Sequence, residues 1–382
     1  MLFLLQLQIY SFRFHSTKVF IFSYLYTKYF YLYAKNIYIC TQKNIISKAM
    51  FEIQNYYAAI SLCFLAMICW GSWQNARNLI TPTWRFELFY WDFSIGIVLF
   101  SLVAAFTLGS IEPANRTFLQ DIAQAAPRYI LFAMTGGFIW NLGTLLLTAG
   151  IATTGMAVAF PIGGGIGWIL GIVVNYIGQP EGNPVWLFIG CMIIVCAIFC
   201  SMLSYKKMAS SRQKSIRGVL YSLVAGLFIA LFYRFVMISI SPDHSPSYDG
   251  GQLTPYSSVV FFATGAFIST CIFNPIFMRH PVEGESLKAK LYFTGTTKIH
   301  LLGMLGGAIW CAGQVLSVMS AGAASPAISY GLSNGAPIVA AIWGIFVWKE
   351  FKNAPKGTNT LLFFMFLLYI IGLGLIIYSR YA

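Results

Sequence analysis

Charged side chains are scarce in this chain of 382 residues: Asp, Glu, Lys and Arg make up 9% of it, whereas 58% is hydrophobic. Soluble domains carry about 25% charged residues, so the composition excludes an ordinary soluble protein. Apolar runs of about 20 residues recur, and each is long enough to cross a hydrocarbon core roughly 30 Å thick. The sequence therefore predicts an all-α polytopic membrane protein embedded in a lipid bilayer.

Motifs for metals, cofactors and nucleotides are also missing. The eight cysteines contain no CxxC pair, the four histidines form no HExxH pair, and no GxxxxGK[ST] phosphate loop occurs. Cysteines within apolar helices act as small hydrophobic residues and need no further role. We therefore expect no cofactor and no metal site. The net charge of +13 does not indicate nucleic acid, because the basic residues lie in short loops between apolar segments.

Residues 1–49 contain no Gly, Pro, Asp or Glu, although the whole chain has 34 Gly. They hold seven Tyr and six Phe, with basic residues spread evenly among them. A signal peptide would show a short basic region, one apolar core and a small-residue cleavage site, and this segment has no such layout. We interpret 1–49 as translated upstream sequence or a disordered extension outside the fold, with a targeting peptide as the alternative.

Apolar segments separated by short polar linkers predict ten helices, near 56–79, 86–109, 129–150, 152–177, 185–204, 217–240, 256–278, 299–321, 323–348 and 359–379. Lys and Arg are distributed unevenly, with fourteen in the linkers of one side and three on the other. The positive-inside rule then places the basic linker 205–216 in the cytoplasm and both termini outside. We expect a plasma membrane or bacterial inner membrane location.

An internal repeat divides the chain. MTGGFIWNLG at 134–143 resembles MLGGAIWCAG at 304–313, and a shift of 170 gives nine identities over 32 positions. Chance would give about two or three for such a composition. The ten helices therefore form two repeats of five, 50–204 and 217–382, and an odd number of crossings inverts the second copy. Inverted repeats are a transporter architecture, with the substrate site near the midplane between the halves.

Two carboxylates stand in the aromatic run WRFELFYWDF at 84–93. Asp92 lies about 9 Å along the axis of helix two, deep enough to be a functional candidate for proton coupling, with a structural ion pair as the alternative. Glu87 lies nearer the membrane surface, where pairing with Arg77 or Arg85 competes with a transport role. Arg234, deep in helix six, either neutralises Asp92, holds substrate oxygens or snorkels to the outer interface.

Polar amides within the predicted helices are further candidates for the substrate path: Asn75, Asn141, Gln314 and Asn334. In a membrane such groups either hydrogen-bond neighbouring helices or line a solute path. Asn141 and Gln314 each neighbour the repeated element. Trp140 and Trp310 are repeat partners, which either stack on a flat heterocycle or on the apolar face of a sugar, or pack in the core.

Glycines at four-residue spacing predict close helix packing and hinge positions: Gly163, Gly167 and Gly171 in helix four, and Gly331 and Gly335 in helix nine. A phosphate loop is not expected there, because GGGIG lies within a helix. Pro161 and Pro337 are expected to kink these two helices.

Three segments carry a family resemblance: CWGSWQNARN at 69–78, YWDF at 90–93 and AAFTLGS at 104–110. They resemble ureide permeases, and with them the glucose/ribose/rhamnose porters, within the drug/metabolite transporter superfamily. Bacterial relatives of the ureide permeases look closer still, over 52–380. The resemblance implies proton-coupled uptake of a small neutral polar solute, such as a ureide, nucleobase or sugar. Plant members carry a phosphate-loop-like motif in a long central loop, which is missing here.

These features predict a secondary active permease that is coupled to protons and moves a small polar metabolite of the ureide or nucleobase class. The alternatives are a monosaccharide porter and a drug or metabolite exporter. An integral membrane enzyme would need clustered His, Asp or Glu near one membrane face, and only Asp92 and Glu87 approach this. The expected partners are a small-molecule solute, protons and lipid, not nucleic acid.

Overall fold

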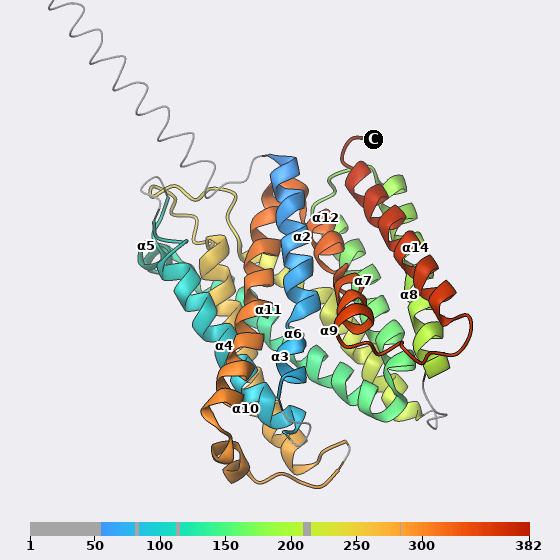
Figure 1. Cartoon of the computed structure of the whole chain (residues 1–382). Coiled ribbons are helices and arrows are strands. Elements are labelled where there is room, and N and C mark those ends of the chain that lie inside the picture. The colour runs from blue at the N-terminus through green and yellow to red at the C-terminus, as the bar shows by residue number, and fades with distance from the viewer. Residues whose placement is uncertain (1–54, 81–83, 112–114, 209–214, 283) are drawn as a thin grey trace, which may run out of the picture. The chain divides into compact units, whose positions relative to one another are not determined.

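The computed structural model describes residues 55–80, 84–111, 115–208, 215–282 and 284–382 (Figure 1). This part of the chain is built almost entirely of helices and contains no strand. Ten of its helices are long and apolar enough to cross a membrane, as the sequence predicts. Residues 1–49, interpreted above as an extension, lie outside the described residues.

The crossings agree with the predicted segments to within a few residues. The first five are α2 with the short α3 (Tyr56–Ser72, Asn75–Asn78), α4 (Phe86–Phe106), α6 (Pro127–Thr154), α7 (Met156–Gly178) and α8 (Pro184–Met208). The second five are α9 (Ile216–Ser239), α10 (Pro255–Arg279), α11 (Thr297–Ala324), α12 with α13 and a π-helical turn (Pro326–Ser333, Ala336–Ile342, Trp343–Val347), and α14 (Thr358–Tyr378). Two short helices in linkers were not predicted: α5 (Phe118–Gln124) and the 3₁₀ helix η1 (Ala289–Thr294).

The ninth crossing departs from its predicted form. The sequence predicts one helix over 323–348 with a kink at Pro337, but the helix is interrupted at Asn334 and Gly335, between α12 and α13. Pro337 lies in the first turn of α13, where its missing N–H removes no intrahelical hydrogen bond. It therefore begins a helix rather than bending one. The fourth crossing, α7, continues through Pro161.

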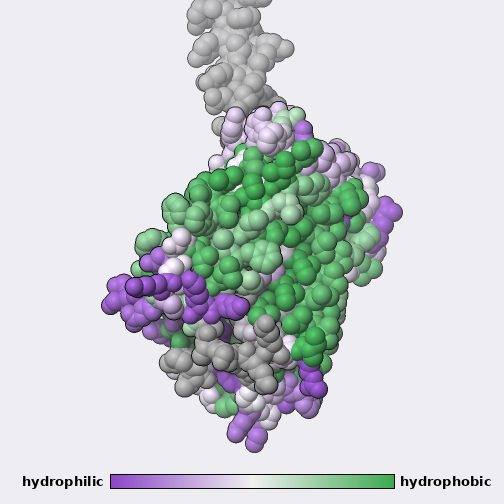
Figure 2. Space-filling view, turned by 90° about the vertical axis from the view of Figure 1, so that its right-hand side faces the viewer, coloured by the Kyte–Doolittle hydropathy of each residue, from purple (hydrophilic) through white to green (hydrophobic). Residues whose placement is uncertain are grey.

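A broad hydrophobic band covers the face shown in Figure 2, with hydrophilic residues gathered toward its ends. The two most apolar crossings are α8 and α14, and in the most apolar 18-residue part of each only 33% of the residues are buried. They pack against each other, and large apolar side chains such as Met192 and Ile370 remain more than 60% exposed. Such a surface suits contact with lipid.

Two pairs of helices approach so closely that only glycine fits at the crossing. A Cβ added to Gly137 of α6 would overlap the backbone carbonyl of Phe262 on α10. A Cβ added to Gly307 of α11 would likewise overlap the carbonyl of Phe93 on α4. The partner helices also place glycines at these crossings. Gly96 of α4 faces the backbone of α11, and Gly265 of α10 faces the backbone of α6. Small residues at such crossings let backbones pack directly.

The packing of the first five crossings has a counterpart in the second five. Helix α6 packs on α9 and α10, and α11 packs on α2 and α4; Figure 1 shows α2 beside α11. The turn from α6 to α7 passes through Gly155 with φ 80°, and the turn from α11 to α12 passes through Ser325 with φ 76°. These two residues are 170 positions apart, which is the shift found in the sequence.

Gly307→Ala is expected to destabilise the protein by about 1–3 kcal/mol, because the added methyl group forces α11 away from α4. Gly322→Ala on the same helix is the control, since a Cβ there meets nothing within 4 Å. It should be neutral or stabilise by about 0.4–1 kcal/mol. Thermal unfolding of the purified protein in detergent compares the two variants, and equal melting temperatures would contradict the close contact.

Candidate functional site

Aromatic rings from four helices meet halfway along the bundle. Trp140 and Trp310 lie near the middle of the 28-residue helices α6 and α11, and their ring centroids are 3.9 Å apart. Trp70 of α2 stacks on Trp310 at 5.9 Å and donates its Nε1 hydrogen to the Trp310 carbonyl oxygen at 3.1 Å. Phe262 of α10 contacts both rings, at 5.5 and 5.8 Å. The structure therefore brings the two predicted repeat partners into direct contact.

Asn141, beside Trp140, connects three helices through its buried carboxamide. Its Oδ1 accepts from the Tyr90 hydroxyl of α4 at 2.8 Å and from Thr270 of α10 at 3.2 Å. Its Nδ2 donates to Ser269 of α10 at 3.1 Å. All four side chains are at most 1% exposed. Asn141 is thus a well-bonded group that holds α4, α6 and α10 together.

Gln314 differs from Asn141, because neither its Oε1 nor its Nε2 has a hydrogen-bond partner among the described residues, although it is 0% exposed. It follows Trp310 by four residues and precedes Ser317 by three, so all three share one face of α11. On that face Trp310 contacts Trp140 of α6, and Ser317 contacts Tyr233 of α9. The Gln314 carboxamide therefore points into the bundle interior at the level of the aromatic cluster.

Hydroxyl groups next to Gln314 are already paired with one another. The Tyr233 hydroxyl lies 3.1 Å from the Ser329 Oγ and donates to the Ser317 carbonyl oxygen at 2.9 Å. Ser320 Oγ lies 2.7 Å from Ser329 Oγ and 3.2 Å from the Cys63 Sγ, which donates to it. This cluster connects α2, α9, α11 and α12 and leaves Gln314 as the unpaired group on its face.

The other two predicted amides lie at helix ends. Asn334 stands at the interruption of the ninth crossing, where its Nδ2 donates to the Tyr330 carbonyl oxygen at 2.9 Å. Asn75 donates to the Ser72 carbonyl oxygen at 2.9 Å and accepts from the Trp348 indole at 2.6 Å. Asn334 therefore stabilises a local backbone turn, and Asn75 connects such a turn to the indole of Trp348.

Asp92 is 0% exposed and binds two side chains that the sequence did not single out. The Tyr292 hydroxyl of η1 donates to Oδ1 at 2.5 Å, and His300 Nδ1 of α11 lies 3.0 and 2.9 Å from the two carboxylate oxygens. Gly303 lies directly against Asp92, because a Cβ there would overlap the Asp92 side chain. Three elements, α4, η1 and α11, thus meet at one carboxylate.

The Tyr292 phenol is held in its protonated form. Burial, together with the hydrogen bond to the Asp92 carboxylate, raises the pKa of Tyr292 above its ordinary value. The phenol therefore remains a hydrogen-bond donor throughout the neutral range. The rings of Tyr292 and His300 also contact each other edge to face, with centroids 4.7 Å apart.

Glu87 forms an ion pair with Arg85, one of the two partners considered from the sequence. The other, Arg77, lies over the Phe86 ring at 5.3 Å. Arg85 also donates to the Glu285 carbonyl oxygen at 2.5 Å and so fastens the linker between α10 and α11 to the start of α4. The Arg85–Glu87 contact is one of the two ion pairs considered from the sequence as the alternative to a transport role.

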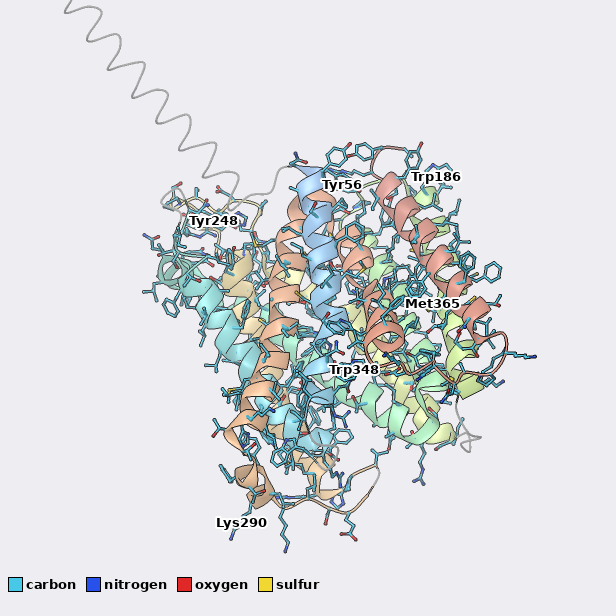
Figure 3. All side chains as sticks on the ribbon, in the orientation of Figure 1. Tyr56, Trp186, Tyr248, Lys290, Trp348 and Met365 are labelled. Carbon is cyan, nitrogen blue, oxygen red and sulfur yellow. The ribbon has the colours of Figure 1, made fainter. Side chains whose placement is uncertain are left out.

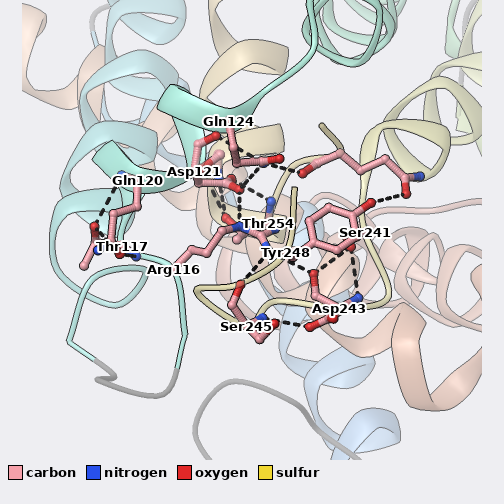
Figure 4. A network of polar contacts seen from close by, with 12 residues as sticks. Arg116, Thr117, Gln120, Asp121, Gln124, Ser241, Asp243, Ser245, Tyr248 and Thr254 are labelled. Carbon is pink, nitrogen blue, oxygen red and sulfur yellow. Dashed lines mark hydrogen bonds and ion pairs between the residues drawn. The ribbon is translucent and has the colours of Figure 1, made fainter. Parts of the chain in front are cut away.

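The opposite end of α4 leads to a second polar network, shown in Figure 4. Arg116 is 1% exposed, and its Nε donates to Asp121 at 2.9 Å. Its Nη1 donates to the carbonyl oxygens of Asp243 and Ser245, at 3.1 and 3.0 Å, in the linker after α9. The other Asp121 oxygen accepts from the Thr254 backbone at 2.7 Å. This network joins the linkers that follow α4 and α9.

Arg234 lies at this second end and not beside Asp92. It stands five residues before the end of α9, and its guanidinium packs against Gly178, the last residue of α7. The Asp92–Arg234 pairing considered from the sequence therefore does not occur, since Asp92 binds His300 near the start of α4. Figure 3 shows Lys290, from η1, at one end of the bundle and Tyr248, from the linker after α9, at the other.

Sequence reasoning missed His300, Tyr292 and the Arg116 network, because their contacts depend on how helices and linkers pack in three dimensions. One available signal pointed to His300: it begins predicted helix eight on the same predicted side of the membrane as Asp92. Within the described residues, no three His, Cys, Asp or Glu side chains are grouped to hold a metal ion.

Ten apolar crossings with buried amide and aromatic side chains between them define a polytopic membrane protein. Residues 89–219 and 202–379 match the sequence profile described as ureide permease. The chain belongs to the ureide permease family.

Curated relatives agree with this assignment. Ureide permease 1 of Arabidopsis thaliana is 24% identical over 86% of this chain and 99% of its own length. Ureide permease 2 of the same plant is 23% identical with the same coverage, and the probable ureide permease A3 of Vigna unguiculata is 23% identical over 80% of this chain. These relatives are named permeases, so the chain is a membrane transporter and not an enzyme.

A solved protein crystal structure resembles this chain with a TM-score of 0.54. The match covers 86% of this chain and 100% of that one, at 14% sequence identity. At this identity the likeness shows the fold alone.

Asn141→Leu is expected to lower the free energy of unfolding by about 2 kcal/mol, because three interhelical hydrogen bonds worth about 0.6 kcal/mol each are lost. Asn175→Leu is the matched control: Asn175 is also buried, but its Nδ2 bonds only within its own helix, to the Gly171 carbonyl oxygen. Thermal unfolding in detergent should show the larger fall for Asn141→Leu. The reverse order would contradict the connecting role of Asn141.

Proposed function

We propose that this protein is a secondary active transporter that moves a small polar solute of the ureide or nucleobase class together with protons. Its family and the names of its relatives support ureides as substrates. The ten apolar crossings support a route through the bundle interior rather than a surface site.

One observation carries the substrate class: the buried and unpaired carboxamide of Gln314. Buried polar groups in native proteins almost always have partners, and each unpaired one costs about 1–3 kcal/mol. A carboxamide offers one acceptor and two donor hydrogens. Ureides and nucleobases present the complementary set, with carbonyl oxygens next to N–H groups. Solute binding would thus supply the partners that Gln314 lacks.

The aromatic cluster next to Gln314 suits a flat solute. Trp140 and Trp310 contact each other in this structure, so a ring that enters between them would replace one stacking contact with two. None of the described residues of this aromatic cluster is charged, which favours a neutral solute. A monosaccharide would also stack on tryptophan, but its hydroxyls would meet a Ser–Tyr cluster whose groups already bond one another.

Two inverted halves of five helices would provide alternating access to such a site. The sequence repeat, the matched turns at Gly155 and Ser325, and the paired glycine crossings support this arrangement. Inverted-repeat transporters hold the substrate near the midplane and rock one half against the other. The interruption between α12 and α13 supports a moving element, since discontinuous helices commonly accompany such sites.

The distribution of basic residues supports a cytoplasmic location for the linker between α10 and α11 and for the basic linker at 205–216. Both termini would then face outward, in a plasma membrane or bacterial inner membrane. The Asp92 site would lie at the cytoplasmic end and the Arg116 network at the outer end.

Counterflow in proteoliposomes tests the transport proposal. Vesicles preloaded with unlabelled solute should take up labelled allantoin or uracil, whereas labelled glucose should stay near the level of empty vesicles. An inward proton gradient should raise accumulation of the transported solute. Glucose counterflow alone would support the monosaccharide alternative, and no counterflow of any of the three would contradict this proposal.

Gln314→Met tests the assigned substrate contact. Methionine keeps the volume but removes the unpaired polar atoms, so the melting temperature should stay equal or rise. Two lost hydrogen bonds to solute should raise the apparent KM about tenfold or more, since about 1.4 kcal/mol corresponds to a factor of ten. A lower melting temperature with unchanged KM would instead assign Gln314 a purely structural role.

A further inference from the structure

Asp92 is completely buried, and no permanently charged basic side chain pairs with it among the described residues. Among the described residues no Lys or Arg forms an ion pair with it, and the basic side chain that it contacts is His300. A buried carboxylate without a cation is costly, by several kcal/mol even after relaxation. With a neutral His300 the pair carries one negative charge. One bound proton makes the pair neutral, whether it resides on the imidazole or on the carboxylate.

The other charged groups around this site have different contacts. Glu87 pairs with Arg85, and Arg77 lies over an aromatic ring. Other charged or basic side chains on the adjoining elements are not bonded to Asp92 within the described residues. They lie at the end of α10, in the following linker and at the start of α11: Arg279, His280, Glu285, Lys288, Lys290 and Lys298. Within the described residues, protonation of the Asp92–His300 pair is therefore the direct way to balance its charge.

We propose that the Asp92–His300 pair, bonded by Tyr292, is the proton-binding site that couples transport to the proton gradient. This inference rests on the proposed function. One proton adds to the pair, which changes from a net charge of −1 to 0, and the same proton later returns to solvent. No other bond is formed or broken in that step.

The exposure of the two side chains supports proton entry through His300. The His300 side chain is 20% exposed, whereas Asp92 is 0% exposed. The imidazole carries two nitrogens, and the one not bonded to Asp92 faces away from the carboxylate. Solvent protons can therefore reach the carboxylate by way of the ring. Trp84 packs edge-on against the same ring at 5.9 Å and helps to fix its orientation.

The same contacts also hold one end of the bundle closed. Tyr292 comes from η1, Asp92 from α4 and His300 from α11, so any separation of these elements breaks the bonds to the carboxylate. Proton occupancy and opening of this end are then thermodynamically linked, because a group that binds protons differently in two states shifts their equilibrium. That linkage is what a proton-coupled transporter requires.

Three variants in proteoliposomes test the site: Asp92→Asn, His300→Gln and, as a matched control, the exposed His280→Gln at the end of α10. The measured quantity is gradient-driven uptake of labelled allantoin divided by counterflow of the same solute in the same preparation. We expect this ratio to fall at least tenfold in Asp92→Asn and His300→Gln, and to match wild type in His280→Gln. The pH dependence of uptake should flatten in the same two variants.

Tyr292→Phe gives a second, independent test that leaves both Asp92 and His300 in place. The phenol donates to the carboxylate and so favours its charged form, and its removal favours proton binding. The pH midpoint of gradient-driven uptake should therefore move to a higher value, with coupling retained.

Each outcome has a defined meaning. Wild-type coupling ratios in both Asp92→Asn and His300→Gln, or an unmoved midpoint in Tyr292→Phe, would overturn the proton site while the transporter proposal stands. If the wild-type protein shows counterflow that a proton gradient does not increase, proton coupling and this site both fail. An absence of wild-type counterflow points to failure of the proposed function itself.

Discussion

The direct backbone contact of α4 with α11, and of α6 with α10, is the constraint on which the rest of the structure depends. Both crossings need glycine, and a single added methyl group at Gly137 or Gly307 would separate the helices. Only at this short distance can Tyr90 and Asn141 bridge α4 and α6 while Asn141 also reaches α10. The same approach places Trp140 and Trp310 ring to ring. Lipid supplies no hydrophobic force between helices, so such packing has to supply the association energy.

Two kinds of polar site stand out inside this bundle. Asn141 and the Ser–Tyr cluster around Tyr233 are fully engaged, and they hold helices in a defined register. Gln314 and the Asp92–His300 pair are incomplete in different ways, one lacking hydrogen-bond partners and the other lacking a fixed counter-charge. Structural groups in a membrane are satisfied by the protein itself. We propose that solute and proton bind at these incomplete groups.

Composition and hydrophobic runs were sufficient to predict the ten crossings, because a span about 20 residues long leaves a strong signal in sequence. The repeat shift of 170 identified Trp140 and Trp310 as repeat partners, but their direct contact was not predicted. The partners of Asp92 could not be predicted, since Tyr292 belongs to a linker whose fold depends on tertiary contacts. Arg234 was considered as a partner of Asp92 because of its charge. Its position along its own helix did not show that the two residues lie at opposite ends of the bundle. The broken ninth crossing was mistaken for a kink, because Pro337 fits either role by sequence.

Ser325 and Gly155 hold nearly the same backbone angles, yet serine is rarely found in that conformation, whereas glycine adopts it freely. The helix that follows Ser325 is interrupted, and the helix that follows Gly155 is continuous. The interrupted helix lacks a continuous series of intrahelical hydrogen bonds, so the two halves differ in structure at this position. A cycle built on such halves would not have mirror-image inward and outward states. Solute would then meet different binding conditions from the two sides of the membrane, while the net flux at equal solute concentrations and without a gradient stays zero.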